Sequence, residues 1–191
     1  MSSIVMTADR PVLADLIPGA RVRDALLIAG GAGLTGAAAQ VSVHTSLSPV
    51  PFTLQTLAVL LVGASLGSLR GLLSMTLYLL AGLAGVPWYA DHSHGWAGPS
   101  FGYILGFVLA ATVVGFLAER RVDRHVLSTA ALMVLGNVII YAIGASWLAV
   151  DLSLSMHKAF ELGVRPFLAS DLLKTAIAAI ALPSAWKLAR R

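Results

Sequence analysis

The sequence predicts an all-α integral membrane protein, a bundle of six transmembrane helices with both termini in the cytoplasm. Of the 191 residues, 58% are hydrophobic and only 12% are charged, whereas soluble globular domains are typically about 25% charged. The charged residues are widely separated, and the stretch between Asp24 and Arg70 contains no Asp, Glu, Lys or Arg. We therefore expect residues 1–23 to form a cytoplasmic tail and residues 24–191 a single transmembrane domain.

Six apolar segments carry this prediction, because a helix that crosses a bilayer needs about 20 predominantly apolar residues. The spans are expected at residues 25–43, 52–66, 72–86, 100–118, 126–147 and 167–187. The segments between them have the composition of loops. In chain order they are a loop with two prolines (44–51), a tight turn between glycines (67–71), a polar loop (87–99), a charged turn (119–125) and a polar linker with room for a short amphipathic helix (151–165).

The first span contains a stripe of small residues that recur at every fourth position. The stripe consists of Ala25, Ala29, Gly33 and Ala37. Small residues let the backbone of another membrane helix approach closely, which favours helix association within the bilayer. Two interpretations stay open: the stripe packs inside this chain, or it docks to a partner subunit.

The distribution of Lys and Arg predicts the orientation, because cytoplasmic loops of membrane proteins are enriched in these residues. With both termini inside, ten of the 13 Lys and Arg residues lie on the inner side, and only Lys158 and Arg165 lie on the outer side. Lys174 is left within the membrane. The loops at 44–51 and 87–99 then meet the start of the last span on the outer side. We expect the chain in the cytoplasmic membrane of a prokaryotic cell.

The last span is the only one with charged residues inside it. From Thr175 to Trp186 there are 12 uncharged residues, or about 18 Å of helix, whereas a bilayer core is about 30 Å thick. A spanning helix must therefore begin near Phe167, which draws Asp171 and Lys174 to the hydrocarbon edge or below. Residues three apart share a helix face, and charges inside a membrane usually face a cavity or a partner. We predict that this pair lines a ligand site.

The sequence lacks the signatures of several other functions. No lysine follows a glycine, so there is no phosphate-binding loop of the Walker type, and neither ATP hydrolysis nor another enzymatic activity is expected. Cysteine is absent, no basic run with interleaved aromatic residues indicates nucleic-acid binding, and no cofactor is predicted. His92 and His94 beside Asp91 are interpreted as a solvated loop and not as a metal site, because zinc sites need three or four well-spaced ligands.

Five local strings carry a family resemblance. They are P-V-P-F-T-L-Q-T at residues 49–56, G-A-S-L-G-S-L-R-G at 63–71, Y-L-L-A-G-L-A-G-V-P at 78–87, G-P-S-F-G-Y at 98–103, and P-F-L followed by D-L-L-K within 166–174. The first and the last string are specific only in combination. Together with the spans they resemble the BioY family, the biotin-specific substrate-binding subunits of energy-coupling-factor transporters.

The resemblance implies a six-helix bundle that binds biotin from the outer side of the membrane. A transmembrane coupling subunit and two cytoplasmic ATPase subunits would supply the energy, and a homo-oligomer that works without them is the other arrangement. Family members place the acid and the lysine of D-L-L-K at the ligand, which correspond to Asp171 and Lys174, and a tyrosine that corresponds to Tyr103. The sequence departs from the glycine-rich pattern of the family at residues 91–95, so contacts from this loop are not carried over.

Biotin requires a site that is mostly apolar with a few placed polar groups. Asp171 can accept hydrogen bonds from the ureido N–H groups, while Lys174 can donate to the ureido carbonyl or pair with the carboxylate. The predicted site is completed by Tyr103, Gln55, Thr53, Trp88, Phe52 and Phe167.

Simpler roles stay open for some of these residues. Asp171 can cap the start of the last helix near Ser170, while the side chain of Lys174 extends to the membrane interface. Gln55 can bond a neighbouring helix, Trp88 can be an interfacial aromatic, and the two phenylalanines can serve packing alone. A rival function is an ion-coupled secondary carrier of a small polar solute, in which Asp171 and Lys174 would form a proton relay.

Overall fold

The computed structural model describes residues 12–17, 21–96 and 98–189. The α-helices are α1 (Arg21–Gln40), α2 (Gln55–Leu66), α3 (Ser68–Leu83), α4 (Phe101–Ala118), α5 (Val126–Asp151), α6 (Met156–Gly163) and α7 (Leu168–Ala189). An antiparallel hairpin of β1 (Ser42–Thr45) and β2 (Ser48–Thr53) lies between α1 and α2. The short 3-10 helices are η1 (Leu13–Leu16), η2 (Ala90–His92), η3 (Val122–Arg124) and η4 (Arg165–Phe167).

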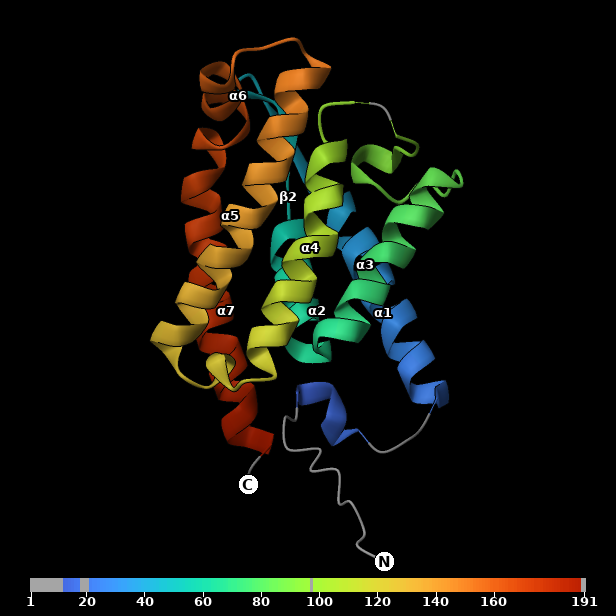
Figure 1. The fold of residues 1–191 in the computed structure, drawn as a ribbon, viewed down its shortest axis with the longest axis vertical. Helices are drawn as coiled ribbons and strands as arrows, with labels where there is room; N and C mark the ends of the chain where they lie inside the picture. The colour runs from blue at the N-terminus through green and yellow to red at the C-terminus, as the bar shows by residue number, and fades with distance from the viewer. Residues whose placement is uncertain (1–11, 18–20, 97, 190–191) are drawn as a thin grey trace, which may run out of the picture.

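α4 is the central helix of the bundle (Figure 1). It packs against α2, α3 and α5, while α1 packs on α3 and α7 packs on α5. Its inward side chains are covered, with exposed fractions of 3% or less at Phe107, Ala110, Ala111 and Val114. The hairpin and α6 lie at one end of the bundle, here called the hairpin end. η1 and the C-terminal end of α7 lie at the other, here called the η1 end.

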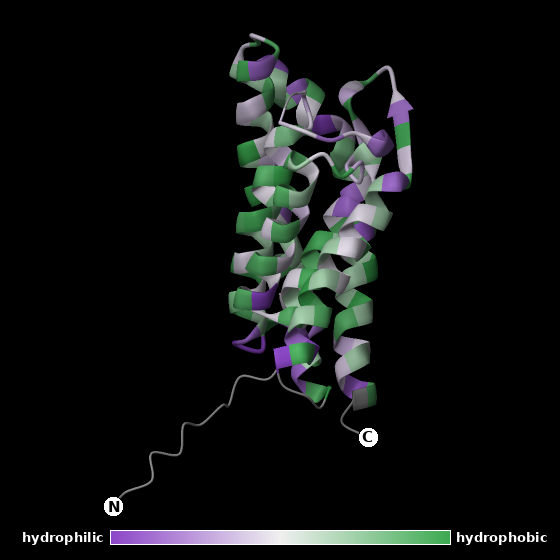
Figure 2. Cartoon of the chain, turned by 90° about the vertical axis from the view of Figure 1, so that its right-hand side faces the viewer, coloured by the Kyte–Doolittle hydropathy of each residue, from purple (hydrophilic) through white to green (hydrophobic). Residues whose placement is uncertain are grey.

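Hydrophobic residues cover most of the helix surface between the two ends (Figure 2), and hydrophilic residues gather towards the ends. By length and composition, three segments of the described chain can cross a membrane: Phe101–Ala118, Val126–Asp151 and Met156–Leu188. They overlap the last three predicted spans, although the third segment begins 11 residues earlier than predicted. α2 and α3 are also apolar but shorter, so the full set of six spans stays a prediction.

The hairpin departs from the predicted all-helical chain, in which residues 44–51 are a loop and a helix begins at Phe52. Phe52 instead belongs to β2 and pairs with Val43 of β1. The two prolines of β2 explain the difference, because proline has no N–H to donate within a helix and is tolerated in edge strands. A two-stranded hairpin has only edge strands, and α2 therefore begins later, at Gln55.

The exposed face of α1 carries the stripe of small residues. The buried residues of this helix are Gly31, Ala32, Thr35, Gly36 and Ala39. The stripe lies on another face, since Ala25, Ala29, Gly33 and Ala37 are all exposed. The interpretation that the stripe packs inside this chain is therefore wrong, and among the described residues this face of α1 lies exposed.

Two glycines bring α4 against the backbone of α2 and of the turn that follows it. Gly67 ends α2 with a φ of +86°, a conformation that favours glycine. A Cβ atom on Gly115 would lie 2.4 Å from the carbonyl carbon of Gly67, and one on Gly63 would lie 2.6 Å from the carbonyl oxygen of Ala111. Both obstacles are backbone atoms, so no side-chain rotation can relieve them.

Replacing Gly115 with Ala is expected to destabilise the protein, because overpacking typically costs about 1–3 kcal/mol and here meets backbone. The apparent melting temperature in detergent, followed by tryptophan fluorescence, should fall by about 2–12 °C. Gly30→Ala is the matched control, since a Cβ atom there has nothing within 4 Å. Equal melting temperatures for the two variants would contradict the close packing of α4.

At the η1 end, a buried carboxylate fixes the last helix. Asp123 of η3 has no exposed surface (0%), and its Oδ2 accepts a hydrogen bond from Nε1 of Trp186 at 2.5 Å. The Arg124 guanidinium stacks over the Trp186 ring, 3.1 Å from the ring centroid. Burial raises the pKa of Asp123 above its ordinary value. α7 is thereby anchored to the connection between α4 and α5.

Candidate ligand site

A cavity lies at the hairpin end, enclosed by β2, the segment that follows α3, and parts of α2, α4, α5 and α7. Its volume is about 220 Å³, far above the roughly 10–15 Å³ that one water molecule needs. Its buried and half-buried wall includes Thr53, Gln55, Thr56, Tyr103, Phe107, Tyr141, Phe167, Asp171 and Lys174. Its exposed rim includes His44, Asp91, Ser93 and His94. The wall is therefore aromatic with one charged pair, and the rim is polar.

The charged pair of the wall is formed by Asp171 and Lys174. Nζ of Lys174 donates to Oδ1 of Asp171 at 2.6 Å, and the two side chains are only 12% and 4% exposed. Asp171 lies in the first turn of α7, where the helix dipole favours a carboxylate. Nζ also donates to the carbonyl oxygen of Thr53 at 2.7 Å and to Oγ1 of Thr56 at 3.0 Å. An ammonium group has three N–H donors, and all three are engaged.

Two further residues that bind Asp171 were not predicted from the sequence. Oγ1 of Thr56 donates to Oδ1 of Asp171 at 3.1 Å, and the hydroxyl of Tyr141 donates to Oδ2. Tyr141 places a hydroxyl in the middle of an apolar segment, where a buried polar group needs a partner. That was the available signal for Tyr141, whereas Thr56 is the last residue of the string at 49–56.

Gln55 belongs to a hydrogen-bond chain behind the cavity. Its Nε2 donates to the Tyr78 hydroxyl at 2.7 Å, and its Oε1 accepts from Oγ1 of Thr53 at 3.2 Å. The Tyr78 hydroxyl donates to the carbonyl of Trp88 at 3.1 Å, and Nε1 of Trp88 donates back to the carbonyl of Tyr78 at 3.0 Å. An amide nitrogen has two N–H donors, so one N–H of Gln55 remains for a ligand.

Aromatic rings form the apolar part of the wall. The ring of Phe167 stacks on that of Phe52, with centroids 4.4 Å apart and planes at 28°. Tyr103 lies next to Phe167, with ring centroids 6.5 Å apart, and its hydroxyl donates to the carbonyl of Gly163 at 2.6 Å. Because this hydroxyl donates to a backbone carbonyl, Tyr103 contributes its aromatic ring, and not its hydroxyl, to the cavity wall.

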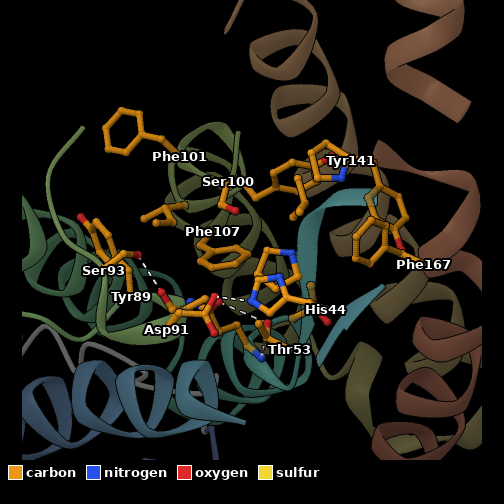
Figure 3. Close-up of a pocket in the computed structure, with 18 of the residues that line it drawn as sticks. His44, Thr53, Tyr89, Asp91, Ser93, Ser100, Phe101, Phe107, Tyr141 and Phe167 are labelled. Carbon is orange, nitrogen blue, oxygen red and sulfur yellow. Dashed lines mark hydrogen bonds and ion pairs between the residues drawn. The ribbon is translucent and has the colours of Figure 1, made fainter. Parts of the chain in front are cut away.

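At the rim, Asp91 of η2 joins the two segments that cover the cavity (Figure 3). Its Oδ1 accepts from Oγ of Ser42 at 2.6 Å, and its Oδ2 lies 2.7 Å from Nε2 of His44. The hydrogen bond from Ser42, with a smaller contribution from His44, lowers the pKa of Asp91 below its ordinary value. The start of β1 is thus tied to the loop after α3 across the cavity mouth.

Most of the predicted ligand residues lie on the cavity. The lining contains Asp171, Lys174, Tyr103, Gln55, Thr53 and Phe167. Phe52 and Trp88 do not belong to this lining: Phe52 lies behind Phe167, and Trp88 fixes the loop after α3 through Tyr78. The prediction did not include the wall residues Thr56 and Tyr141 or the acidic and basic groups of the rim.

Comparisons with known proteins identify the family of the chain. A model of the BioY family matches residues 8–191. The probable biotin transporter BioY of Pyrococcus horikoshii is 39% identical over 163 residues, which cover 84% of this chain and 94% of that protein. The biotin transporter BioY of Thermotoga maritima is 38% identical over 141 residues, which cover 72% of this chain and 82% of that protein.

A solved structure has the same fold. It is described as the S-component for biotin from an ECF-type ABC transporter, and the match has a TM-score of 0.79 with 19% sequence identity. The match covers 87% of this chain and 92% of that one. On the family match and on the two relatives above, the chain belongs to the BioY family.

Proposed function

We propose that this protein captures biotin at the outer face of a prokaryotic cell membrane, as the substrate-binding subunit of an uptake system. The observation that carries the proposal is the buried pair of Asp171 and Lys174 on the wall of an otherwise largely aromatic cavity. Ligand sites commonly combine an apolar lining with a few polar groups that fix orientation. Biotin has this division, since its ureido group is polar and its thioether ring and aliphatic chain are apolar.

The free hydrogen-bonding positions of the wall match a ureido group. Within the described residues, Oδ1 of Asp171 accepts from Lys174 and Thr56, whereas Oδ2 accepts only from Tyr141. A carboxylate oxygen has two lone pairs, so Oδ2 can accept one more hydrogen bond, from a ureido N–H. The remaining N–H of Gln55 can donate to the ureido carbonyl. The rings of Tyr103 and Phe167 would cover the bicyclic core of biotin.

The proposal includes the topology inferred from the sequence: six spans, with both termini in the cytoplasm and the hairpin end outside. Energy would come from a transmembrane coupling subunit and two cytoplasmic ATPase subunits, with a homo-oligomer as the other arrangement. The exposed stripe Ala25, Ala29, Gly33 and Ala37 on α1 supports a helix of a partner at this face, because small residues allow close approach in the bilayer.

The direct test is ligand retention. Protein purified in detergent from biotin-fed cells, without added ligand, is expected to release about one biotin per chain on denaturation, measured by mass spectrometry. Protein without a small molecule of this mass, which also fails to bind labelled biotin, would refute the proposal. Uptake by ATPase-free vesicles that collapses with an uncoupler would favour an ion-coupled carrier instead.

A further inference from the structure

A chain of hydrogen bonds connects the C-terminal end of α1 to Gln55 on the cavity wall. Nε2 of Gln40, the last residue of α1, donates to the carbonyl oxygen of Trp88 at 3.2 Å. The same carbonyl accepts from the Tyr78 hydroxyl at 3.1 Å, and that hydroxyl accepts from Nε2 of Gln55 at 2.7 Å. Gln40 and Tyr78 do not line the cavity themselves, so they can influence a ligand only through other residues.

The direction of this chain determines how the Gln55 amide is turned. A backbone carbonyl can only accept hydrogen bonds, so the Tyr78 hydroxyl donates its single proton to Trp88 and accepts from Gln55. The NH2 group of Gln55 must therefore face Tyr78, while its Oε1 accepts from Oγ1 of Thr53 at 3.2 Å. Gln55 and Tyr78 are only 5% and 0% exposed. Turning the amide over would bring two oxygen atoms together without a proton between them, which is costly in a buried site.

α1 holds the Trp88 carbonyl from the other side. Nε2 of Gln40 also donates to the carbonyls of Gly36 and Tyr89, each at 3.1 Å. The Trp88 ring packs against α1 where Gly36 has no side chain, since a Cβ atom there would lie 3.3 Å from Cε3 of the ring. A carbonyl oxygen has two lone pairs, and Gln40 and Tyr78 occupy both of those on Trp88. The position of the carbonyl that orients Tyr78 is thus set by α1.

We infer that Gln40 and Tyr78 are positioning residues for ligand recognition, because they hold the Gln55 amide with its remaining N–H as a donor to the ureido carbonyl. This inference rests on the proposed function, in which Gln55 donates to that carbonyl. No described residue of α1 lines the cavity, yet the end of this helix would contribute to specificity. Without the chain, the amide could turn over and present its oxygen to the ligand carbonyl, which would repel it.

The test compares biotin with 2-thiobiotin, in which sulfur, a weaker hydrogen-bond acceptor, replaces the ureido oxygen. Dissociation constants for both compounds are measured on the full-length protein in detergent, for the parent, Tyr78→Phe and Gln40→Met. The parent should prefer biotin by about fivefold, which corresponds to one typical hydrogen bond. Tyr78→Phe should remove this preference. Gln40→Met should reduce it to about twofold, because Tyr78 can still reach the Trp88 carbonyl.

Two further variants serve as controls. Thr35 is a fully buried residue of α1 whose hydroxyl donates to the carbonyl of Gly31, outside this chain. Thr35→Val should keep the preference of the parent even if its melting temperature falls. Gln55→Leu should abolish the preference by itself, and adding Gln40→Met to it should change nothing further. Residues that act through one shared group have non-additive effects, whereas independent structural damage would add.

The outcomes separate this inference from the proposed function. The inference is wrong, and the proposed function stands, if the parent binds biotin and 2-thiobiotin equally well. The same holds if Tyr78→Phe and Gln40→Met keep the preference of the parent, or if the effect of Gln40→Met adds to that of Gln55→Leu. If the parent binds neither compound, the proposed function itself fails, and the inference with it.

Discussion

Asp171→Asn is expected to weaken biotin binding by about a hundredfold or more. The carboxylate accepts hydrogen bonds from Lys174, Thr56 and Tyr141, and an amide can replace only one of its two oxygens. Its NH2 group would face a donor, and the ammonium group of Lys174 would lose its counter-charge in a site that is 12% exposed. In the complex, a ureido N–H would be left without its charged acceptor, and an unsatisfied buried group typically costs about 1–3 kcal/mol, or more where a charge is involved. Equilibrium binding of labelled biotin to the purified variant measures the effect.

Asp123→Asn is the matched control for this substitution. Like Asp171, Asp123 is a buried carboxylate. Its hydrogen-bond donor is the indole N–H of Trp186, and it lies at the η1 end, away from the cavity. This variant should lower the melting temperature without changing the biotin affinity of the folded protein. If Asp171→Asn bound biotin as tightly as the parent does, the assignment of the site to this pair would be wrong.

The second large effect concerns α1. Leucines at both Ala29 and Gly33 are expected to abolish energised biotin uptake by cells and to leave biotin binding by the purified protein unchanged. Both positions are exposed on α1, and no atom lies within 4 Å of a Cβ atom on Gly33. The fold can therefore accept the larger side chains, but a partner helix could no longer approach the backbone.

The readouts are uptake of labelled biotin and co-purification with the coupling and ATPase subunits. Leucines at Ala131 and Ala142, exposed positions on α5, form the control pair and should leave both readouts intact. Normal co-purification of the Ala29 and Gly33 variant would show that the partner docks elsewhere, and a loss of biotin binding would indicate a defect of the fold instead.

The sequence was most informative where a residue was energetically out of place. A carboxylate and an ammonium group inside an apolar segment need compensation, and this requirement identifies Asp171 and Lys174 from the sequence alone. Hydroxyl groups give a weaker signal of this kind, because a threonine or tyrosine can also be tolerated in a span for packing alone. Thr56 and Tyr141 therefore became visible only when α2, α5 and α7 were placed side by side.

The hairpin was missed for a different reason. The prolines at residues 49 and 51 correctly excluded a helix there, but the choice between a loop and a strand depends on a partner for Phe52, which local sequence does not identify. The spacing of the stripe on α1 could not decide whether it faces the interior of the protein or the outside, because small residues recur at the same interval on either face. Burial of Gly31, Ala32 and Thr35 decides between them.

The hydrogen bond from Lys174 to the carbonyl of Thr53 connects β2, which covers the cavity, to the Asp171–Lys174 pair on the cavity wall. Thr53 is the last residue of β2, two residues before the start of α2, and its carbonyl accepts a hydrogen bond from the lysine that compensates Asp171. Displacing β2 far enough to admit or release a solute would strain this tether and, through it, the arrangement of donors around Asp171. Opening of the cavity by β2 and weakening of the hydrogen bonds to the ligand would then occur in a single coupled motion.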